Sequence, residues 1–152
     1  MYTGLLALHS VLRWVVILLG IWAVVRALSR GSRPWLPADD AAGQWFGTSL
    51  DVQMLIGLVL YGIFSPITRM AFGNMGAAMR DPVIRFFVVE HASLMILALA
   101  FAHVGRVRVR RARVDAAKFK TAAIFYSIAL LAVLLATPWP FRAVGRPLLP
   151  MV

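Results

Sequence analysis

Apolar residues dominate four stretches of the chain, which cover residues 5–28, 46–64, 83–104 and 119–137. Within each stretch the apolar run is continuous, and its length is close to the ~20 residues that an α-helix needs to cross a ~30 Å hydrocarbon layer. A transmembrane β-strand is only about ten residues long and alternates apolar with polar positions. The pattern therefore predicts an all-α fold of four transmembrane helices.

The composition is typical of a membrane protein with little chain outside the bilayer. Apolar residues make up 61% of the chain, charged residues 14%, and the mean hydropathy is +0.81. No internal repeat is visible, and no connection is long enough for a second domain, so residues 1–152 are predicted to form one integral membrane four-helix bundle with up-down-up-down order. The N-terminal residues lack the basic region of a cleavable signal peptide, so we expect the first helix to stay in the mature protein.

Basic residues are distributed unequally between the two ends of the predicted bundle. The connections after the first and third helices carry ten of them, and the opposite end carries five. Because short loops rich in Lys and Arg stay in the cytoplasm, we expect both termini on the outer, periplasmic side of a bacterial inner membrane. The first group contains Arg26, Arg30, Arg33, Arg106, Arg108, Arg110, Arg111, Arg113, Lys118 and Lys120, and the second Arg69, Arg80, Arg85, Arg142 and Arg146.

The net charge of +10 is compatible with contact to anionic lipid headgroups at the cytoplasmic loops. A nucleic-acid partner is not expected, because the basic residues lie next to the membrane spans and no soluble recognition fold accompanies them. The absence of cysteine excludes disulfides, thiolate metal sites and covalently attached haem. No phosphate-binding loop, nucleophile elbow or HExxH motif is present, so nothing indicates a hydrolase or a nucleotidase.

Three histidines lie inside the predicted spans, His9 in the first and His91 and His103 in the third. An ionisable residue inside the membrane is a functional-site hypothesis by default. At about 1.5 Å of rise per residue, His9 and His91 lie roughly 6 and 12 Å below the outer boundary. If the first and third helices are neighbours or diagonal partners, the two imidazoles can ligate one metal from opposite sides. A b-type haem fits that arrangement.

His103 cannot belong to the same haem site as His91. Twelve residues separate them, which corresponds to about 18 Å of rise and ~120° around the helix. At its level near the cytoplasmic boundary, Asp51 and Gln53 of the second helix can approach it. We favour an interfacial role, in which His103 reaches the headgroups beside Arg106, over a functional one.

Arg13 follows His9 by one helical turn and shares its face. A buried guanidinium needs a counter-charge, and two candidates are open. One is Glu90, next to His91, in which case the pair only fixes helix packing. The other is a haem propionate, since guanidinium groups form bidentate pairs with carboxylates.

The face of the third helix that carries His91 continues through Met95, Ala98 and Ala102. Such a small-residue surface allows close approach of either a flat macrocycle or, more commonly, a neighbouring helix. A comparable stripe of the second helix carries Gln53, Gly57 and Tyr61. We expect Gln53 and Tyr61 to form hydrogen bonds between helices.

Three short motifs give the chain a resemblance to a known group of proteins: LHSVLRW in the first helix, VVEH in the third and AHVGR at its end. It resembles small four-helix bacterial membrane proteins of the cytochrome b-like type and, more distantly, cytochrome b561-type bundles. The resemblance implies a b haem between helices with His9 and His91 as axial ligands, quinol or periplasmic redox partners, and often membership of a larger respiratory complex. Two-haem cytochromes b resembling this chain have four histidines, with pairs spaced wider than His91 and His103, so two bis-histidine haems in one monomer are excluded.

Three functional hypotheses follow. The leading one is a single-haem electron carrier in which His9 and His91 bind iron, Arg13 neutralises a propionate and Glu90 tunes the site or relays a proton. The second is a cofactor-free accessory subunit that packs against other membrane subunits, with Arg13 and Glu90 as an internal pair. The third is a proton or small-ion carrier using Glu90 and His91, which the lack of pseudo-repeats disfavours.

Overall fold

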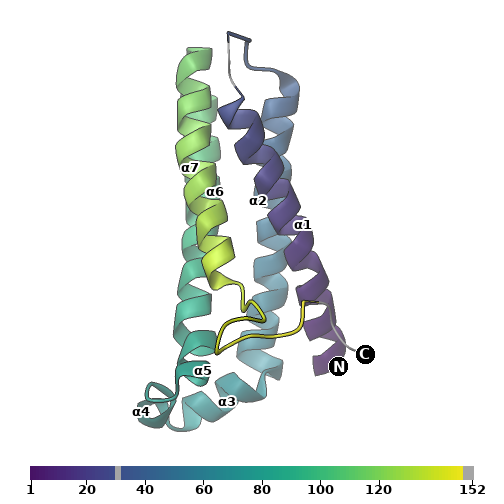
Figure 1. Cartoon of the computed structure of the whole chain (residues 1–152), viewed down its shortest axis with the longest axis vertical. Helices are drawn as coiled ribbons and strands as arrows, with labels where there is room; N and C mark the ends of the chain where they lie inside the picture. Colours follow the sequence, from purple (N-terminus) through teal and green to yellow (C-terminus); the bar gives the residue numbers. More distant parts are fainter. Residues whose placement is uncertain (30–31, 149–152) are drawn as a thin grey trace.

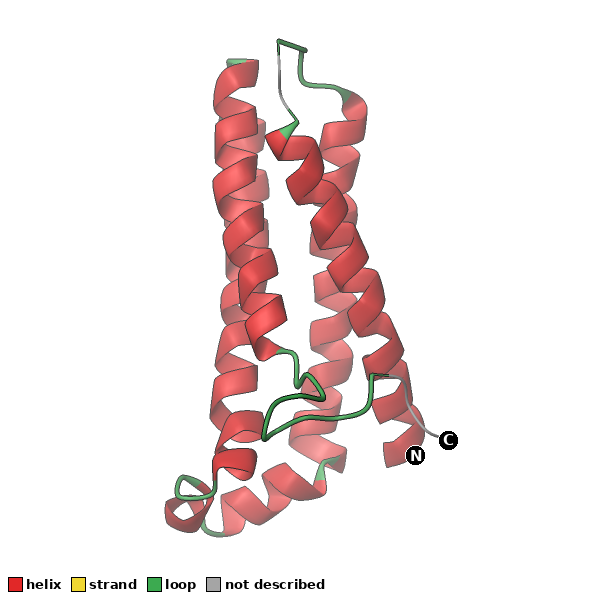
Figure 2. Cartoon of the chain, viewed as in Figure 1, coloured by secondary structure: helices red, strands yellow, loops and turns green. Residues whose placement is uncertain are grey.

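The computed structural model describes residues 1–29 and 32–148, and all regular structure among them is helical (Figures 1 and 2). Four long helical spans run along the long axis of the molecule, and three short helices lie together at one end of it. In chain order the elements are α1 (Tyr2–Leu28), α2 (Pro37–Val59), the π-helical segment η1 (Leu60–Phe64), α3 (Pro66–Gly73), α4 (Met75–Ala78), α5 (Pro82–Arg85), the π-helical segment η2 (Phe86–Glu90), α6 (His91–Arg111) and α7 (Asp115–Ala136).

Four helical spans are long and apolar enough to cross a membrane: Tyr2–Leu28, Pro37–Phe64, Pro82–Arg111 and Asp115–Ala136. Their outer faces carry large apolar side chains, as expected of surfaces that contact lipid tails. The chain is therefore a multi-pass membrane protein, and the prediction of an all-helical fold with four such helices is confirmed.

The second span begins nine residues earlier than its apolar stretch predicted, at Pro37 instead of residue 46. Its first turn is polar, and therefore invisible to hydropathy, but it is well capped. Proline occupies the first helical position, and the Asp39 carboxylate accepts a hydrogen bond of 2.8 Å from the main-chain nitrogen of Leu36. The same carboxylate forms salt bridges with Arg26 at 2.8 Å and Arg33 at 2.7 Å. Its hydrogen bond raises the pKa of Arg33 above the ordinary arginine value.

The third span extends seven residues beyond the predicted end at residue 104, as far as Arg111. Its arginine-rich end is thus a helical extension, and only residues 112–114 separate α6 from α7. Arg30, counted among the basic residues of the same end, lies outside the described residues. The main-chain nitrogen of Trp35 donates a 3.0 Å hydrogen bond to Asp115, which places the α1–α2 connection beside the start of α7.

At the opposite end, η1 forms the last turn of the second span, and η2 interrupts the third span between α5 and α6. Ser65 follows η1 and caps α3, and the Asp81 carboxylate accepts hydrogen bonds of 2.8 and 2.9 Å from Val83 and Ile84 at the start of the third span. Single π-helical turns inside α-helices often accompany functional sites. Here η2 ends immediately before His91, so its irregular turn sets the direction of that side chain.

Small residues bring the four spans into close contact. Helix α6 packs against α7, α7 against α1, α1 against α2 and α2 against α6, which closes the bundle. Ala98, Ala122 and Ala129 are completely buried between helices, and Phe46 fills the space beside them. Alanine and glycine at such positions permit the short interhelical distances that van der Waals packing in a membrane needs.

Candidate functional site

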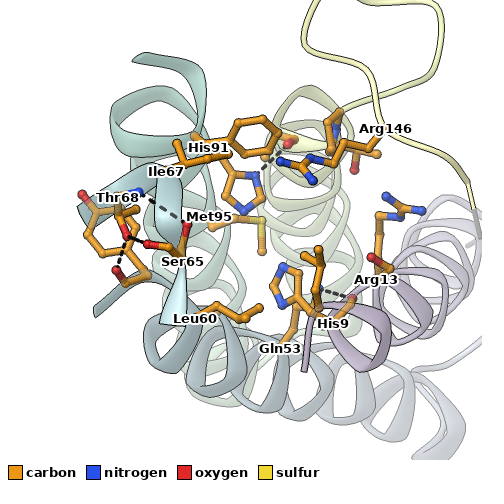
Figure 3. A pocket seen from close by; sticks show the side chains of 18 of the residues that line it. His9, Arg13, Gln53, Leu60, Ser65, Ile67, Thr68, His91, Met95 and Arg146 are labelled. Carbon is orange, nitrogen blue, oxygen red and sulfur yellow. Dashed lines mark hydrogen bonds between the residues drawn. The ribbon is translucent and has the colours of Figure 1, made fainter. Parts of the chain in front are cut away.

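His9 from α1 and His91 from the start of α6 lie beside one another near the end of the bundle that carries the short helices (Figure 3). Their ring centroids are 6.2 Å apart, and their planes are inclined by 68°. Metal–imidazole bonds are about 2 Å long, so two imidazoles on opposite sides of one metal ion have ring centres about 6 Å apart. The predicted meeting of these two histidines is thus present, and their ring centres are about as far apart as in such a pair.

The orientation of His91 is fixed by a hydrogen bond to α7. Its Nδ1 lies 2.8 Å from the main-chain oxygen of Ala136. Because a carbonyl oxygen can only accept, Nδ1 carries the proton, and Nε2 of the neutral ring retains its lone pair. Metal-binding histidines usually have this arrangement, in which one ring nitrogen donates to a carbonyl and the other is free to ligate.

His9 is held between α1 and α2. The side-chain amide of Gln53 donates a 3.0 Å hydrogen bond to the main-chain oxygen of His9, and Gly57 leaves room for its ring. A Cβ added at Gly57 would lie 3.3 Å from Cε1 of His9. Nδ1 of His9 and Oε1 of Gln53 are both buried with no hydrogen-bond partner among the described residues. Two unsatisfied polar atoms in one place are unusual in a folded protein and point to a site that functions with something bound.

A cavity surrounds the two rings. It has a volume of about 130 Å³ and is open on one side, so as it stands it is smaller than the ~300–1,000 Å³ typical of small-molecule sites. Its walls are mainly apolar, with Leu60, Phe87 and Met95 near the histidines. Besides the histidines, the polar residues that line it are Tyr2, Ser10, Arg13, Gln53, Tyr61, Ser65, Thr68, Thr137 and Arg146.

Arg13 lies at this cavity, as its position one turn after His9 predicted. It is 9% exposed, and its Nη2 donates a 2.7 Å hydrogen bond to the main-chain oxygen of Leu148. Its Nε is buried and has no partner in residues 1–29 and 32–148. Among residues 1–29 and 32–148, no carboxylate is paired with this guanidinium group at the cavity.

The segment after α7 crosses this end of the bundle and reaches α1, where Leu148 accepts the hydrogen bond from Arg13 (Figure 1). We call residues 138–148 the C-terminal strap. Arg142 stacks on Phe86 at 4.9 Å and Arg146 on Phe87 at 4.8 Å, so the strap is fastened to η2. Arg146 thereby joins Arg13 at the cavity and adds a second positive charge.

The structure does not bring Glu90 to the cavity. Its carboxylate forms a 2.9 Å salt bridge with Arg85, its side chain is 42% exposed, and it is not among the residues that line the described cavity. Neighbouring residues of a helix point about 100° apart, so with His91 directed inward Glu90 is turned away. The Arg13–Glu90 pair, one of the two explanations open for Arg13, is not formed in the described structure.

His103 is remote from the other two histidines, as expected, and it has a different partner. Its Nε2 lies 2.8 Å from Oδ1 of Asp51 on α2. Of the two polar residues expected to approach it, Asp51 does so, whereas Gln53 bonds to His9. The predicted inward face of α6 is confirmed, because Met95, Ala98 and Ala102 are all buried.

Two contributors to the site were missed by sequence reasoning. One is Arg146, which lies in a proline-containing segment after the last span, where no periodic pattern predicts the path of the chain. The other is the main-chain oxygen of Ala136, because the sequence does not show which main-chain oxygens contact a side chain. Within the described residues no group of three or more His, Asp or Glu side chains could hold a metal ion. Comparison of the chain with protein-family models, with curated proteins and with solved structures gave no match.

Proposed function

We propose that this protein binds one b-type haem between α1 and α6, with His9 and His91 as the axial ligands, and carries electrons within a membrane redox complex. The strongest support is the His9–His91 pair, because two helices contribute one imidazole each at a ring separation of 6.2 Å. The hydrogen bond from Nδ1 of His91 to the main-chain oxygen of Ala136 leaves Nε2 of the same ring available to bind iron. Bis-histidine ligation of this kind is typical of b-type haems.

The remaining residues of the cavity suit the same ligand. Arg13 and Arg146 supply two positive charges where a haem presents two propionates, and the buried Nε of Arg13 gains a partner. Leu60, Phe87 and Met95 give an apolar wall that contacts the macrocycle and limits the access of water. A bound haem supplies a one-electron couple, and the protein sets its potential through the two ligands and the nearby charges.

The location and partners follow from the charge distribution. We place the chain in the bacterial inner membrane, in up-down-up-down order, with both termini and the haem towards the periplasm and the arginine-rich end of α6 at anionic cytoplasmic headgroups. Other membrane subunits or a second copy are expected partners, and quinone is the expected mobile electron carrier. Glu90 does not line the described cavity, its carboxylate is paired with Arg85, and it receives no role in haem binding.

A visible spectrum of the purified protein in detergent tests this proposal. We expect a b-type α-band after reduction with dithionite and about one haem per chain by the pyridine haemochrome assay. His9→Ala and His91→Ala should each abolish haem retention. His103→Ala is the matched control and should retain haem, because its side chain bonds to Asp51 away from the cavity.

Two outcomes would contradict the proposal in different ways. Loss of haem in His103→Ala alone would show that the ligands are wrongly assigned. A blank spectrum from protein extracted with its native assembly would favour the cofactor-free accessory subunit, in which the same histidines serve only helix packing. Circular dichroism of each variant shows whether the bundle still forms, so a failure to fold is not mistaken for a lost ligand.

A further inference from the structure

The His103–Asp51 pair is a polar contact on the outside of the bundle. The two side chains are 46% and 45% exposed, although they lie only 2.8 Å apart. His103 uses Nε2 and Asp51 uses Oδ1, and the other polar atom of each, Nδ1 and Oδ2, has no hydrogen bond within residues 1–29 and 32–148. Each residue therefore presents one unused hydrogen-bonding atom outward.

The pair is located within the apolar part of the bundle. Asp51 lies about 21 Å along the span that begins at Pro37, and His103 lies about 12 Å before the end of α6. The surrounding side chains are apolar and point outward, with Leu55 64% exposed on α2 and Val107 47% exposed on α6. Lipid tails can supply no hydrogen-bond partner at this depth.

Ionisable side chains in membrane spans almost always face protein or a water-filled cavity, because exposure to hydrocarbon is costly. Within the chain, the α2–α6 contact leaves this pair at its outer edge. His103 lies within reach of the headgroups beside Arg106, whereas Asp51 lies deeper along its span, so a second protein surface at this edge would supply the partners that lipid tails cannot. As an ion pair, in which both ring nitrogens of His103 carry a proton, the two side chains need one acceptor for the imidazolium and one donor for the carboxylate, at the same depth.

We propose that a second copy of this chain covers the pair, across a two-fold axis parallel to the membrane normal. Such an axis preserves depth, so it places His103 of one copy opposite Asp51 of the other and satisfies both unused atoms reciprocally. A surface with an adjacent donor and acceptor is complementary to itself in this arrangement. The apolar side chains around the pair, Leu55 and Val107 among them, then pack between the copies.

Cysteine cross-linking tests this interface, because the chain contains no cysteine of its own. Val107→Cys lies one turn from His103 on the proposed interface, and Val25→Cys is the matched control on α1. Both side chains are about half exposed, at 47% and 55%, and both lie about one turn before the end of their helix. After mild oxidation of native membranes containing the full chain, we expect a disulfide-linked dimer from Val107→Cys and none from Val25→Cys.

Variants of the pair give the second part of the test. Asp51→Asn in the Val107→Cys background should lower the cross-linked fraction about tenfold, and the exchange Asp51→His with His103→Asp should restore it, since donor and acceptor are only interchanged. Haem content should remain at the wild-type level in each, so failure here is distinct from failure of the proposed function. Equal cross-linking of both cysteines, no cross-linking of Val107→Cys, or its cross-linking to a different protein would each overturn the proposal.

Discussion

Gly57 is the residue whose size most directly limits the histidine site. It lies on α2 opposite His9, and a Cβ at this position would be 3.3 Å from Cε1 of the imidazole, which is closer than ordinary van der Waals contact. A helix interior normally favours alanine over glycine. Its presence here is explained by the space that the His9 ring needs.

We therefore expect Gly57→Ala to displace the His9 ring by a few tenths of an ångström and to weaken haem retention by about tenfold, a loss typical of changes next to a metal ligand. Haem content through purification and the position of the α-band measure this effect. Gly62→Ala is the matched control, since an added Cβ there meets nothing within 4 Å. Equal haem content in the two variants would show that Gly57 does not position His9.

The proposed site contains His9, Arg13, His91 and Arg146. The first three could be predicted from the sequence because they break the apolar pattern of a membrane span. His9 and Arg13 share a helix face by spacing, and His91 lies at a similar depth, so helix geometry alone brings them to one layer. Glu90 was assigned to the same layer by its depth, but depth does not fix direction. The 2.9 Å contact with Arg85 and the rotation from His91 direct Glu90 elsewhere.

At the scale of the elements, the C-terminal strap is the part of the site that sequence could not supply. Pro138 and Pro140 follow the end of α7 at Ala136 and cannot continue a helix, but they do not determine where the following residues go. Its position depends on the stacking of Arg142 and Arg146 on η2 and on the hydrogen bond from Arg13 to Leu148. These contacts join residues more than fifty positions apart, and no local pattern encodes them.

Arg146 should raise the reduction potential of the bound haem, because a nearby positive charge disfavours the oxidised form. We expect Arg146→Gln to lower the midpoint potential by roughly 40 mV, equivalent to about 1 kcal/mol for a one-electron couple. Arg80→Gln is the control, since Arg80 is an exposed arginine between α4 and α5 at the same end of the bundle and does not line the described cavity. Potentiometric titration measures both, and equal shifts would contradict a specific role for Arg146.

Helix ends were predicted less well than helix centres, for a consistent reason. Hydropathy reports only the apolar part of a span. Helix α2 therefore begins before its predicted limit, with a polar turn that contains Asp39, and α6 continues past its predicted limit through an arginine-rich segment. The start of α2 at Pro37 was nevertheless marked in the sequence, by a proline at the first helical position and by Asp39 in the first turn. The four spans themselves were predictable because the length of each apolar run is dictated by the thickness of the bilayer.

On the scale of the whole molecule, the structure gathers charge at two ends of an apolar bundle. Arg106 and its neighbours near the end of α6 lie at the end that also carries the salt bridges of Asp39, whereas Arg69 and Arg85 lie at the end with the short helices and the cavity. The excess of basic residues at the first end predicts that it faces the cytoplasm. The haem site would then be closer to the periplasm.

Cysteine labelling decides this orientation. Met70 on α3 and Val114 between α6 and α7 are each 63% exposed and lie at opposite ends of the bundle, so Met70→Cys and Val114→Cys form a matched pair in a cysteine-free chain. In intact spheroplasts, a membrane-impermeant maleimide should label Met70→Cys, while Val114→Cys should react only after lysis. Both should react in detergent, which controls for accessibility. The reverse pattern would place the arginine-rich end outside, and the His9–His91 site would then exchange electrons with cytoplasmic rather than periplasmic partners.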